Sequence, residues 1–184
     1  QWIIVGHESR IPEKGNYFLF NIENESIIII RDDNGKINCF YNVCRHRGSK
    51  ICLENEGSTR SLICPYHAWS YKLDGSLKSA RLMDEDFCSD EWSLHKCNSI
   101  IFEGLIFINF SNKPDNFNQF IKPVKPFIEL HGLGEAKIAA RRKYHTMGNW
   151  KLTLDNFHEC YHCQPSHPEY CEVHSSDYIK EYGA

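Results

Sequence analysis

The sequence has no long apolar run and no surplus of positive charge. None of its hydrophobic stretches approaches the roughly 20 residues of a membrane-spanning helix, and the opening QWIIVGHESR lacks the basic region and cleavage site of a signal peptide. A net charge of -3 argues against a basic surface for nucleic acid or anionic lipid. We therefore expect a cytoplasmic protein that binds neither nucleic acid nor membrane.

Internal repeats and low-complexity segments are also absent, and the number of cysteines is odd. Nine cysteines stand beside ten histidines without a secretion signal. This composition favours metal binding plus several buried thiols over a full disulfide framework. At 184 residues and 41% hydrophobic content, the chain can form one substantial domain, or one domain and part of a second.

Short strands separated by turns are predicted for the first two thirds of the chain. Their alternation with turn signals is typical of a small antiparallel sandwich or barrel, in which ligands lie on the loops between strands. The clearest strand segments are YFLFNI (17–22), SIIII (26–30), INCFY (37–41), WSY (69–71) and GLIFINF (104–110).

The pattern changes near residues 111–116, where we place a boundary. Residues 117–133 have helical spacing broken by Pro123 and Pro126, and residues 136–147 could form a strand. Residues 149–161 are predicted to form a helix. The segment after the boundary is therefore α+β, but it is short for an independent domain.

Two cysteine–histidine pairs form the first motif, CRHRG (44–48) and CPYH (64–67). Each half offers one thiolate and one imidazole, which suits either a zinc site or a [2Fe-2S] cluster with two thiolates on one iron and two imidazoles on the other. Zinc fingers usually separate their cysteine half from their histidine half. Two mixed halves favour the two-iron cluster, and Trp69 and Tyr71 would shield its sulfides.

The strings CRHRG and CPYHAWSYKLDGSL resemble the cluster loops of the Rieske non-haem iron oxygenases, in their large, catalytic component. The resemblance implies that Cys44 and Cys64 bind one iron of the cluster and that His46 and His67 bind the other. The extra cysteine pair that forms a disulfide in respiratory-chain Rieske proteins is missing. Cys39 and Cys52 are interpreted as core thiols.

A second motif, DNFHECYHCQPSH (155–167), concentrates histidine and cysteine. Taken alone, Cys160 and Cys163 could be half of a zinc site, and His158 and His162 would share one helical face. No second Cys-x2-Cys exists in the chain, so an all-cysteine zinc site cannot be completed.

The same oxygenases carry an acidic residue, a carboxylate and two histidines at the spacing of Asp155, Glu159, His162 and His167. The resemblance implies that His162 and His167 bind a mononuclear iron, whose third, carboxylate ligand comes from later in the chain than this sequence extends. It also implies that Glu159, supported by Asp155, bridges His162 to a cluster histidine of an adjacent subunit for electron transfer. His158, Cys160 and Cys163 would pack in the protein interior or support the metal ligands.

Glutamate at position 159 and the string NWKLTLDNFHECYHCQPSHPE resemble the group that acts on quaternary ammonium compounds such as glycine betaine and carnitine. The implied activity is oxidative N-demethylation with O2, using electrons from NAD(P)H through a separate flavin/ferredoxin-type reductase, in a homotrimer. An aromatic-ring hydroxylating dioxygenase and a Rieske ferredoxin-like electron carrier are the alternatives.

The resemblance extends over nearly the whole sequence but over only the amino-terminal part of such an enzyme. It implies a mainly β protein: a Rieske-type antiparallel β-sandwich over residues 1–112, then the opening α+β segment of a helix-grip catalytic domain over residues 113–184. We therefore expect a fragment of a longer oxygenase, with the exact substrate determined by residues beyond 184.

Overall fold

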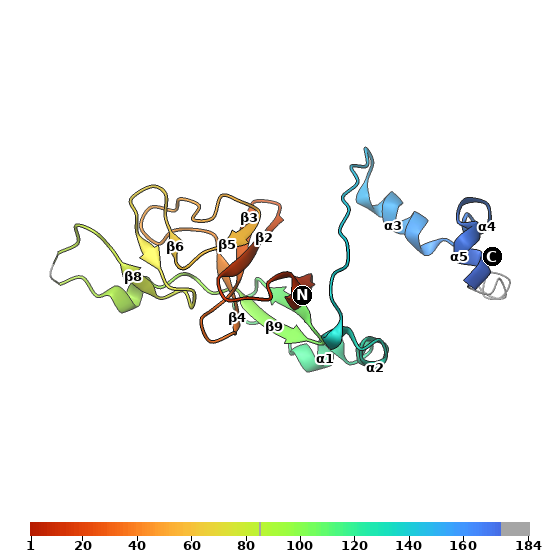
Figure 1. Cartoon of the computed structure of the whole chain (residues 1–184), viewed down its shortest axis with the longest axis horizontal. Coiled ribbons are helices and arrows are strands. Elements are labelled where there is room, and N and C mark those ends of the chain that lie inside the picture. The colour runs from red at the N-terminus through yellow and green to blue at the C-terminus, as the bar shows by residue number, and fades with distance from the viewer. Residues whose placement is uncertain (85, 174–184) are drawn as a thin grey trace. The chain divides into compact units, whose positions relative to one another are not determined.

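The computed structural model of the chain describes residues 1–84 and 86–173 and divides into two compact units, residues 1–140 and 141–184. Antiparallel strands dominate the first unit, and short helices the second (Figure 1). In the described residues the strands are β1 (Ile3–His7), β2 (Asn16–Ile22), β3 (Glu25–Arg31), β4 (Ile37–Tyr41), β5 (Glu56–Ser58), β6 (Leu62–Ile63), β7 (Ser70–Tyr71), β8 (Leu77–Ser79), β9 (Asn98–Phe102) and β10 (Leu105–Asn109).

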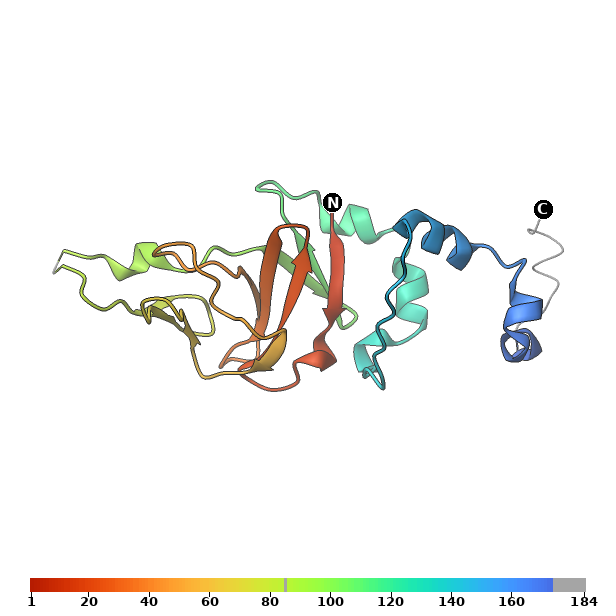
Figure 2. The same ribbon diagram turned by 90° about the horizontal axis from the view of Figure 1, so that it is seen from above.

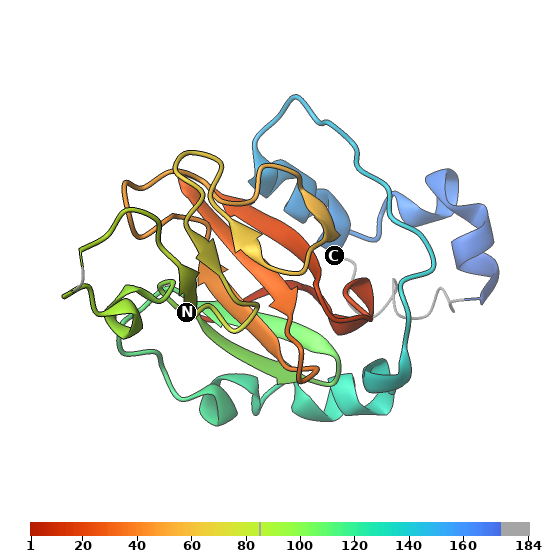
Figure 3. The same cartoon turned by 60° about the vertical axis from the view of Figure 1, so that its left-hand side comes forward.

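Helical segments occur between some strands and, after β10, as separate short helices (Figure 3). The 3-10 turns are η1 (Glu8–Arg10), η2 (Ser89–Trp92) and η3 (Leu133–Glu135). The α-helices are α1 (Phe117–Ile121), α2 (Lys125–Leu130), α3 (Trp150–His158), α4 (Cys163–Ser166) and α5 (Pro168–Val173). None of the helices in residues 1–84 and 86–173 has the length and apolar character needed to cross a bilayer.

Strand β3 lies at the centre of the first unit because both of its faces are buried. Ile28 and Ile30 pack into a core with β6, β7 and the loops that follow β4 and β6. Ile27 and Ile29 pack on the opposite face against β1 and β10. This double burial explains the uninterrupted isoleucine run, since a strand covered on one face only would alternate apolar and polar residues.

Three antiparallel sheets follow from this arrangement. The central sheet has the order β4-β3-β2-β5, and sheets β6-β7-β8 and β1-β10-β9 contribute to the cores on either face of it. Figure 2 shows the amino-terminal strand beside strands formed near residue 105, as the β1-β10 pairing requires. The sandwich is thus closed by a contact between the two ends of the β-rich segment.

Helix α1 covers part of the β1-β10-β9 sheet. Phe117 of α1 packs edge-on against Trp2, with 5.3 Å between ring centroids, and against Phe107 at 5.0 Å. The segment that follows the strands therefore belongs structurally to the first unit as far as residue 140. A division between functional domains at residue 112 stays a prediction about the intact protein.

The expected strand segments are all present, and the helical spacing of residues 117–133 is confirmed as α1 and α2. The prediction of a strand over residues 136–147 is wrong, because these described residues pair with no strand and have no regular secondary structure. The predicted helix from residue 149 ends earlier than expected, at His158. Glu159 has an extended backbone, with φ -90° and ψ 121°.

Candidate functional site

Two loops of the same construction carry the first set of candidate residues, residues 44–49 after β4 and residues 64–69 between β6 and β7. In each loop the N–H of the first residue donates to the carbonyl of the sixth at 2.8 Å, and the N–H of the fifth donates to the carbonyl of the first at 3.0 Å. The fifth residues, Gly48 and Ala68, have φ of 73° and 58°. This left-handed residue turns each loop back on itself, so the two cysteines occupy equivalent positions.

The thiols of these loops lie inside and the imidazoles lie towards solvent. Cys44 and Cys64 are 3% and 2% exposed, whereas His46 is half-buried and His67 is exposed. The rings of His46 and His67 are 4.7 Å apart, centroid to centroid. The four side chains therefore form an inner sulfur pair and an outer nitrogen pair, the division that a cluster with one iron on each pair requires.

The chemistry of these side chains fits an iron–sulfur group. Burial, with a smaller contribution from the neighbouring Cys64, raises the pKa of the Cys44 thiol. A bound iron ion would favour the thiolate form of such a buried cysteine. Nδ1 of His46 is buried and has no hydrogen-bond partner in the described part of the chain. Burial of the ring, with His67 and Arg47 nearby, lowers the pKa of His46, which keeps the imidazole in its neutral, metal-binding form.

Aromatic side chains surround the pair of loops. The Trp69 ring stacks on His46, with centroids 4.8 Å apart and an interplanar angle of 8°. The Tyr71 hydroxyl lies 3.2 Å from Sγ of Cys44 and accepts the backbone N–H of Arg45 at 3.1 Å. The shielding role expected for Trp69 and Tyr71 is thus divided, since one covers an imidazole and the other contacts a sulfur.

Asn42 anchors the segment that follows the first loop and was missed by sequence reasoning. It is fully buried, and its Oδ1 accepts the backbone N–H groups of Ile51 at 3.0 Å and Cys52 at 2.9 Å. Its Nδ2 donates to the Cys52 carbonyl at 2.8 Å. A lone asparagine between a strand and a cysteine motif has no pattern that would reveal these contacts.

The second set of candidate residues lies around the end of α3 and the start of α4. The Glu159 carboxylate lies 3.1 Å from Nδ1 of His162 through one oxygen and accepts the His162 backbone N–H at 3.1 Å through the other. This contact lowers the pKa of Glu159, chiefly through the hydrogen bond to the His162 side chain. It also gives a reason for the early end of α3, since an extended Glu159 is able to cap the next turn.

The structure brings the two histidines of this region together. The rings of His162 and His167 are 5.4 Å apart and nearly perpendicular, and both residues line one open hollow of the second unit with Cys160 and Cys163. Asp155 lies in the last turns of α3, where its carbonyl accepts the Glu159 N–H at 3.0 Å. His158, the last residue of α3, is not on a helical face with His162 because the helix ends between them.

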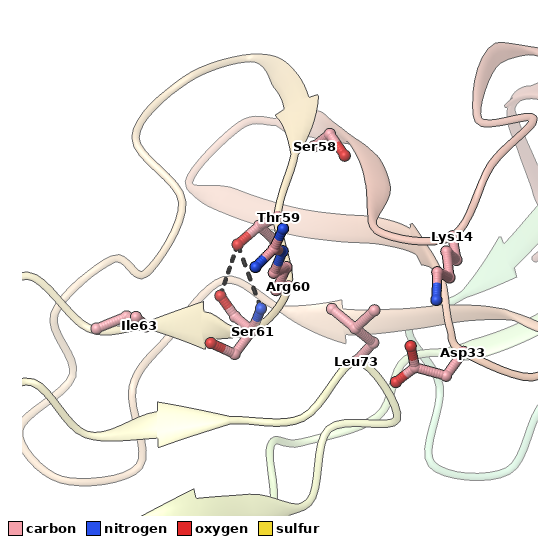
Figure 4. Close-up of a pocket in the computed structure, with 8 residues that line it drawn as sticks. All are labelled: Lys14, Asp33, Ser58, Thr59, Arg60, Ser61, Ile63 and Leu73. Carbon is pink, nitrogen blue, oxygen red and sulfur yellow. Dashed lines mark hydrogen bonds between the residues drawn. The ribbon is translucent and has the colours of Figure 1, made fainter.

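No three histidine, cysteine, aspartate or glutamate side chains in residues 1–84 and 86–173 are placed to hold one metal ion. A separate hollow lies beside β5 and β6 (Figure 4), where the Thr59 hydroxyl donates to the Ser61 carbonyl at 2.7 Å. It contains none of the candidate ligands. We therefore describe two separate candidate sites, one formed by the two cysteine–histidine loops of the first unit and one formed by residues 159–167 of the second.

Comparison with known protein families assigns the two candidate regions to two different domains. Residues 1–97 match the Rieske [2Fe-2S] domain, and the chain belongs to this family. Residues 133–182 match the ring hydroxylating alpha subunit (catalytic domain). The chain thus joins a Rieske domain to part of a ring-hydroxylating catalytic domain, the combination found in Rieske non-haem iron oxygenases, whose cofactors are a [2Fe-2S] cluster and a mononuclear iron.

Relatives of known activity share most of this chain. The glycine betaine monooxygenase oxygenase subunit of Pseudomonas aeruginosa (strain PAO1) is 38% identical over 92% of the chain, which spans 40% of that protein. A quaternary ammonium Rieske monooxygenase solved with its substrate L-carnitine has a TM-score of 0.82 at 34% identity, covering 95% of this chain and 51% of that one. Naphthalene 1,2-dioxygenase from Rhodococcus sp. has a TM-score of 0.83 at 30% identity, covering 94% and 41%.

Proposed function

We propose that this chain is the amino-terminal part of an oxygenase component that removes an N-methyl group from a small quaternary ammonium compound, glycine betaine or carnitine. The proposal rests mainly on the 38% identity to a glycine betaine monooxygenase oxygenase subunit, which extends over 92% of this chain. The Glu159–His162 contact at 3.1 Å supports it. When bound, the cluster and the mononuclear iron would supply electrons and activate O2 for hydroxylation of an N-methyl carbon.

We assign the cluster to Cys44, His46, Cys64 and His67. The buried sulfur pair, the outer imidazole pair and the equivalent loops support this assignment. The Arg45 N–H occupies a lone pair of the Tyr71 oxygen, which leaves the hydroxyl proton free to donate to Sγ of Cys44. A donor at this sulfur favours the more negative, reduced state of the site.

His162 and His167 are assigned to the mononuclear iron, with a carboxylate from elsewhere in the protein as the third ligand. Glu159 is a positioning residue in this proposal. By accepting the Nδ1–H of His162, its carboxylate fixes the tautomer in which Nε2 is free to bind metal. Its second proposed contact is with a cluster histidine of an adjacent subunit, in a homotrimer, with Asp155 as the supporting acid.

The intact protein is proposed to act in the cytoplasm with O2, a flavin/ferredoxin-type reductase and NAD(P)H. Hydroxylation of an N-methyl carbon gives a carbinolamine, which breaks its C–N bond to release formaldehyde and a tertiary amine. Neither an electron carrier nor a nucleic-acid binder would need the catalytic-domain segment at residues 133–182. That segment is therefore the reason for preferring an enzyme to a Rieske ferredoxin-like carrier.

Formaldehyde is the product that tests the proposal. We expect the intact enzyme, incubated with its reductase and NADH, to release formaldehyde from glycine betaine and, second in order, from carnitine. Chromatography of the products would identify the corresponding tertiary amine. Turnover of benzoate-like arenes to cis-diols, with no turnover of glycine betaine or carnitine, would instead support the alternative, an aromatic-ring dioxygenase. The similarity to naphthalene 1,2-dioxygenase is the observation that favours this alternative.

Tyr71→Phe is expected to lower the reduction potential of the cluster without removing it. The substitution deletes the donor to Cys44 and keeps the buried ring. A one-electron couple shifts by about 59 mV for a tenfold change in equilibrium constant, so the loss of part of a hydrogen bond to a charged sulfur gives a fall of several tens of mV. An EPR-monitored redox titration measures this shift.

The control for Tyr71→Phe is Tyr66→Phe, a change at an exposed tyrosine in the loop between β6 and β7. Both variants should retain two irons and two acid-labile sulfides per chain and a Rieske-type EPR signal. An unchanged potential in Tyr71→Phe would show that the hydroxyl does not donate to the cluster sulfur. Stoichiometric zinc without sulfide in the unsubstituted protein would overturn the cluster assignment itself.

A further inference from the structure

Two cysteines stand on either side of His162 in a single tight turn. The Cys163 N–H donates to the Cys160 carbonyl at 3.0 Å, and a turn closed in this way holds its first and fourth Cα atoms within about 7 Å. Disulfides span Cα separations of about 4.4–6.8 Å. The turn therefore holds the two cysteines at a separation that a disulfide can span without a large backbone movement.

The two thiols differ in access. Cys160 is partly exposed, whereas Cys163 is 8% exposed, and both line the hollow that contains His162 and His167. A small oxidant that enters this hollow meets Cys160 first and finds the second thiol behind it. An accessible thiol beside a resolving thiol is the arrangement that converts oxidation into a reversible disulfide.

Other cysteines of the chain lack this combination. Cys39, Cys52 and Cys97 are all buried, so a dissolved oxidant does not reach their thiols. Cys88 is exposed, in the segment before η2. Among the described cysteines outside the cluster loops, only Cys160 and Cys163 place an accessible thiol and a second thiol in one turn.

We propose that Cys160 and Cys163 form a redox-active dithiol that hydrogen peroxide oxidises to a disulfide. The Cys160 sulfur attacks one peroxide oxygen, the O–O bond breaks, and the released hydroxide takes up a proton to become water. The Cys163 sulfur then attacks the Cys160 sulfenic acid, the S–O bond breaks, and a second water leaves. Two electrons and two protons pass from the thiols to peroxide, and a thiol reductant reverses the reaction.

The disulfide closes a ring that includes the backbone of His162 and lies next to Glu159 in the sequence. Its formation therefore makes the candidate iron-site segment sensitive to oxidation. The disulfide itself depends only on the turn and the two thiols. Its formation is therefore independent of the proposed substrate, and a failure of the N-demethylation assay would leave it unaffected.

Peptide mass after peroxide treatment tests the proposal. Trypsin cleavage after Lys151 and Lys180 gives one peptide that contains Cys160, Cys163 and Cys171. In the intact enzyme with its cluster, exposure to hydrogen peroxide followed by alkylation should give this peptide minus two hydrogens, with Cys171 alkylated. Treatment with dithiothreitol before alkylation should restore three alkylated cysteines.

Matched serine variants identify the pair. Cys160→Ser and Cys163→Ser should each abolish the loss of two hydrogens, whereas Cys171→Ser should retain it. The cluster EPR signal confirms that each variant has a folded Rieske domain, since the three positions lie outside the first unit. A disulfide that involves Cys171, or oxidation of Cys160 to sulfinic acid without any disulfide, would overturn the proposal.

Discussion

Replacing Glu159 with alanine is expected to lower substrate turnover by about 100-fold while both metals stay bound. The substitution removes both contacts of the carboxylate with His162, at 3.1 Å to Nδ1 and 3.1 Å to the backbone N–H. His162 then loses the acceptor that fixes its tautomer. In the proposed trimer it also loses the link to a cluster histidine of the adjacent subunit. Steady-state formaldehyde release measures the loss, and metal analysis measures the retained iron.

Two further variants separate charge from contact at position 159. Glu159→Gln keeps the length of the side chain and an oxygen that can accept a hydrogen bond. It should therefore keep the contact with the His162 backbone N–H but lose the negative charge. Glu159→Asp keeps the charge on a shorter arm and should retain part of the turnover. Near-normal turnover in Glu159→Ala would mean that Glu159 is an ordinary surface residue.

Metal content distinguishes the two ways in which Glu159→Ala could be inactive. Retained mononuclear iron, a reducible cluster and slow reoxidation of that cluster in the presence of substrate and O2 are expected for a positioning residue. Loss of the mononuclear iron alone would show that Glu159 is itself a ligand. Stopped-flow reduction and reoxidation of the cluster provide a readout that a purely structural defect in α4 would not reproduce.

Asn42→Ala is expected to lower the free energy of unfolding by at least about 3 kcal/mol. The side chain satisfies two buried backbone N–H groups and one carbonyl in the segment that follows the first cluster loop. Alanine leaves these groups unpaired, at about 1–3 kcal/mol for each group that stays buried. Since a domain of this size is stable by only about 5–15 kcal/mol, urea unfolding followed by fluorescence should detect the change readily.

The control is Asn21→Ala, which changes the same residue type at an exposed position of β2 and should alter stability by less than about 0.5 kcal/mol. Cluster content gives the second measurement. Because Asn42 ties residues 51 and 52 to the end of β4, we expect Asn42→Ala to lose iron and sulfide faster than the control on mild heating. Equal stability and equal cluster retention in the two variants would contradict the anchoring role.

Local spacing in the sequence was sufficient to predict the candidate ligand set and the strand segments. Cys-x-His and Cys-x2-His in two separate loops predicted a mixed ligand set, and the strand segments around them were confirmed. This works because turn residues and strand periodicity are local properties that a short stretch expresses on its own. The order of Asp155, Glu159, His162 and His167 likewise depends only on spacing along the chain, and it agreed with the catalytic-domain match at residues 133–182.

Long-range packing and hydrogen bonding decided the rest. The 3.2 Å contact of Tyr71 with Cys44 joins residues 27 apart in sequence. The backbone contacts of Asn42 with residues 51 and 52 cross the whole first cluster loop, and the burial of Cys44 depends on the core around it. The absence of a strand over residues 136–147 is also a tertiary result, since a strand forms only where a partner edge exists. Sequence alone determined which side chains were available for metal, and the fold decided which of them face inward, because burial and hydrogen-bond partners depend on chain segments that no local pattern specifies.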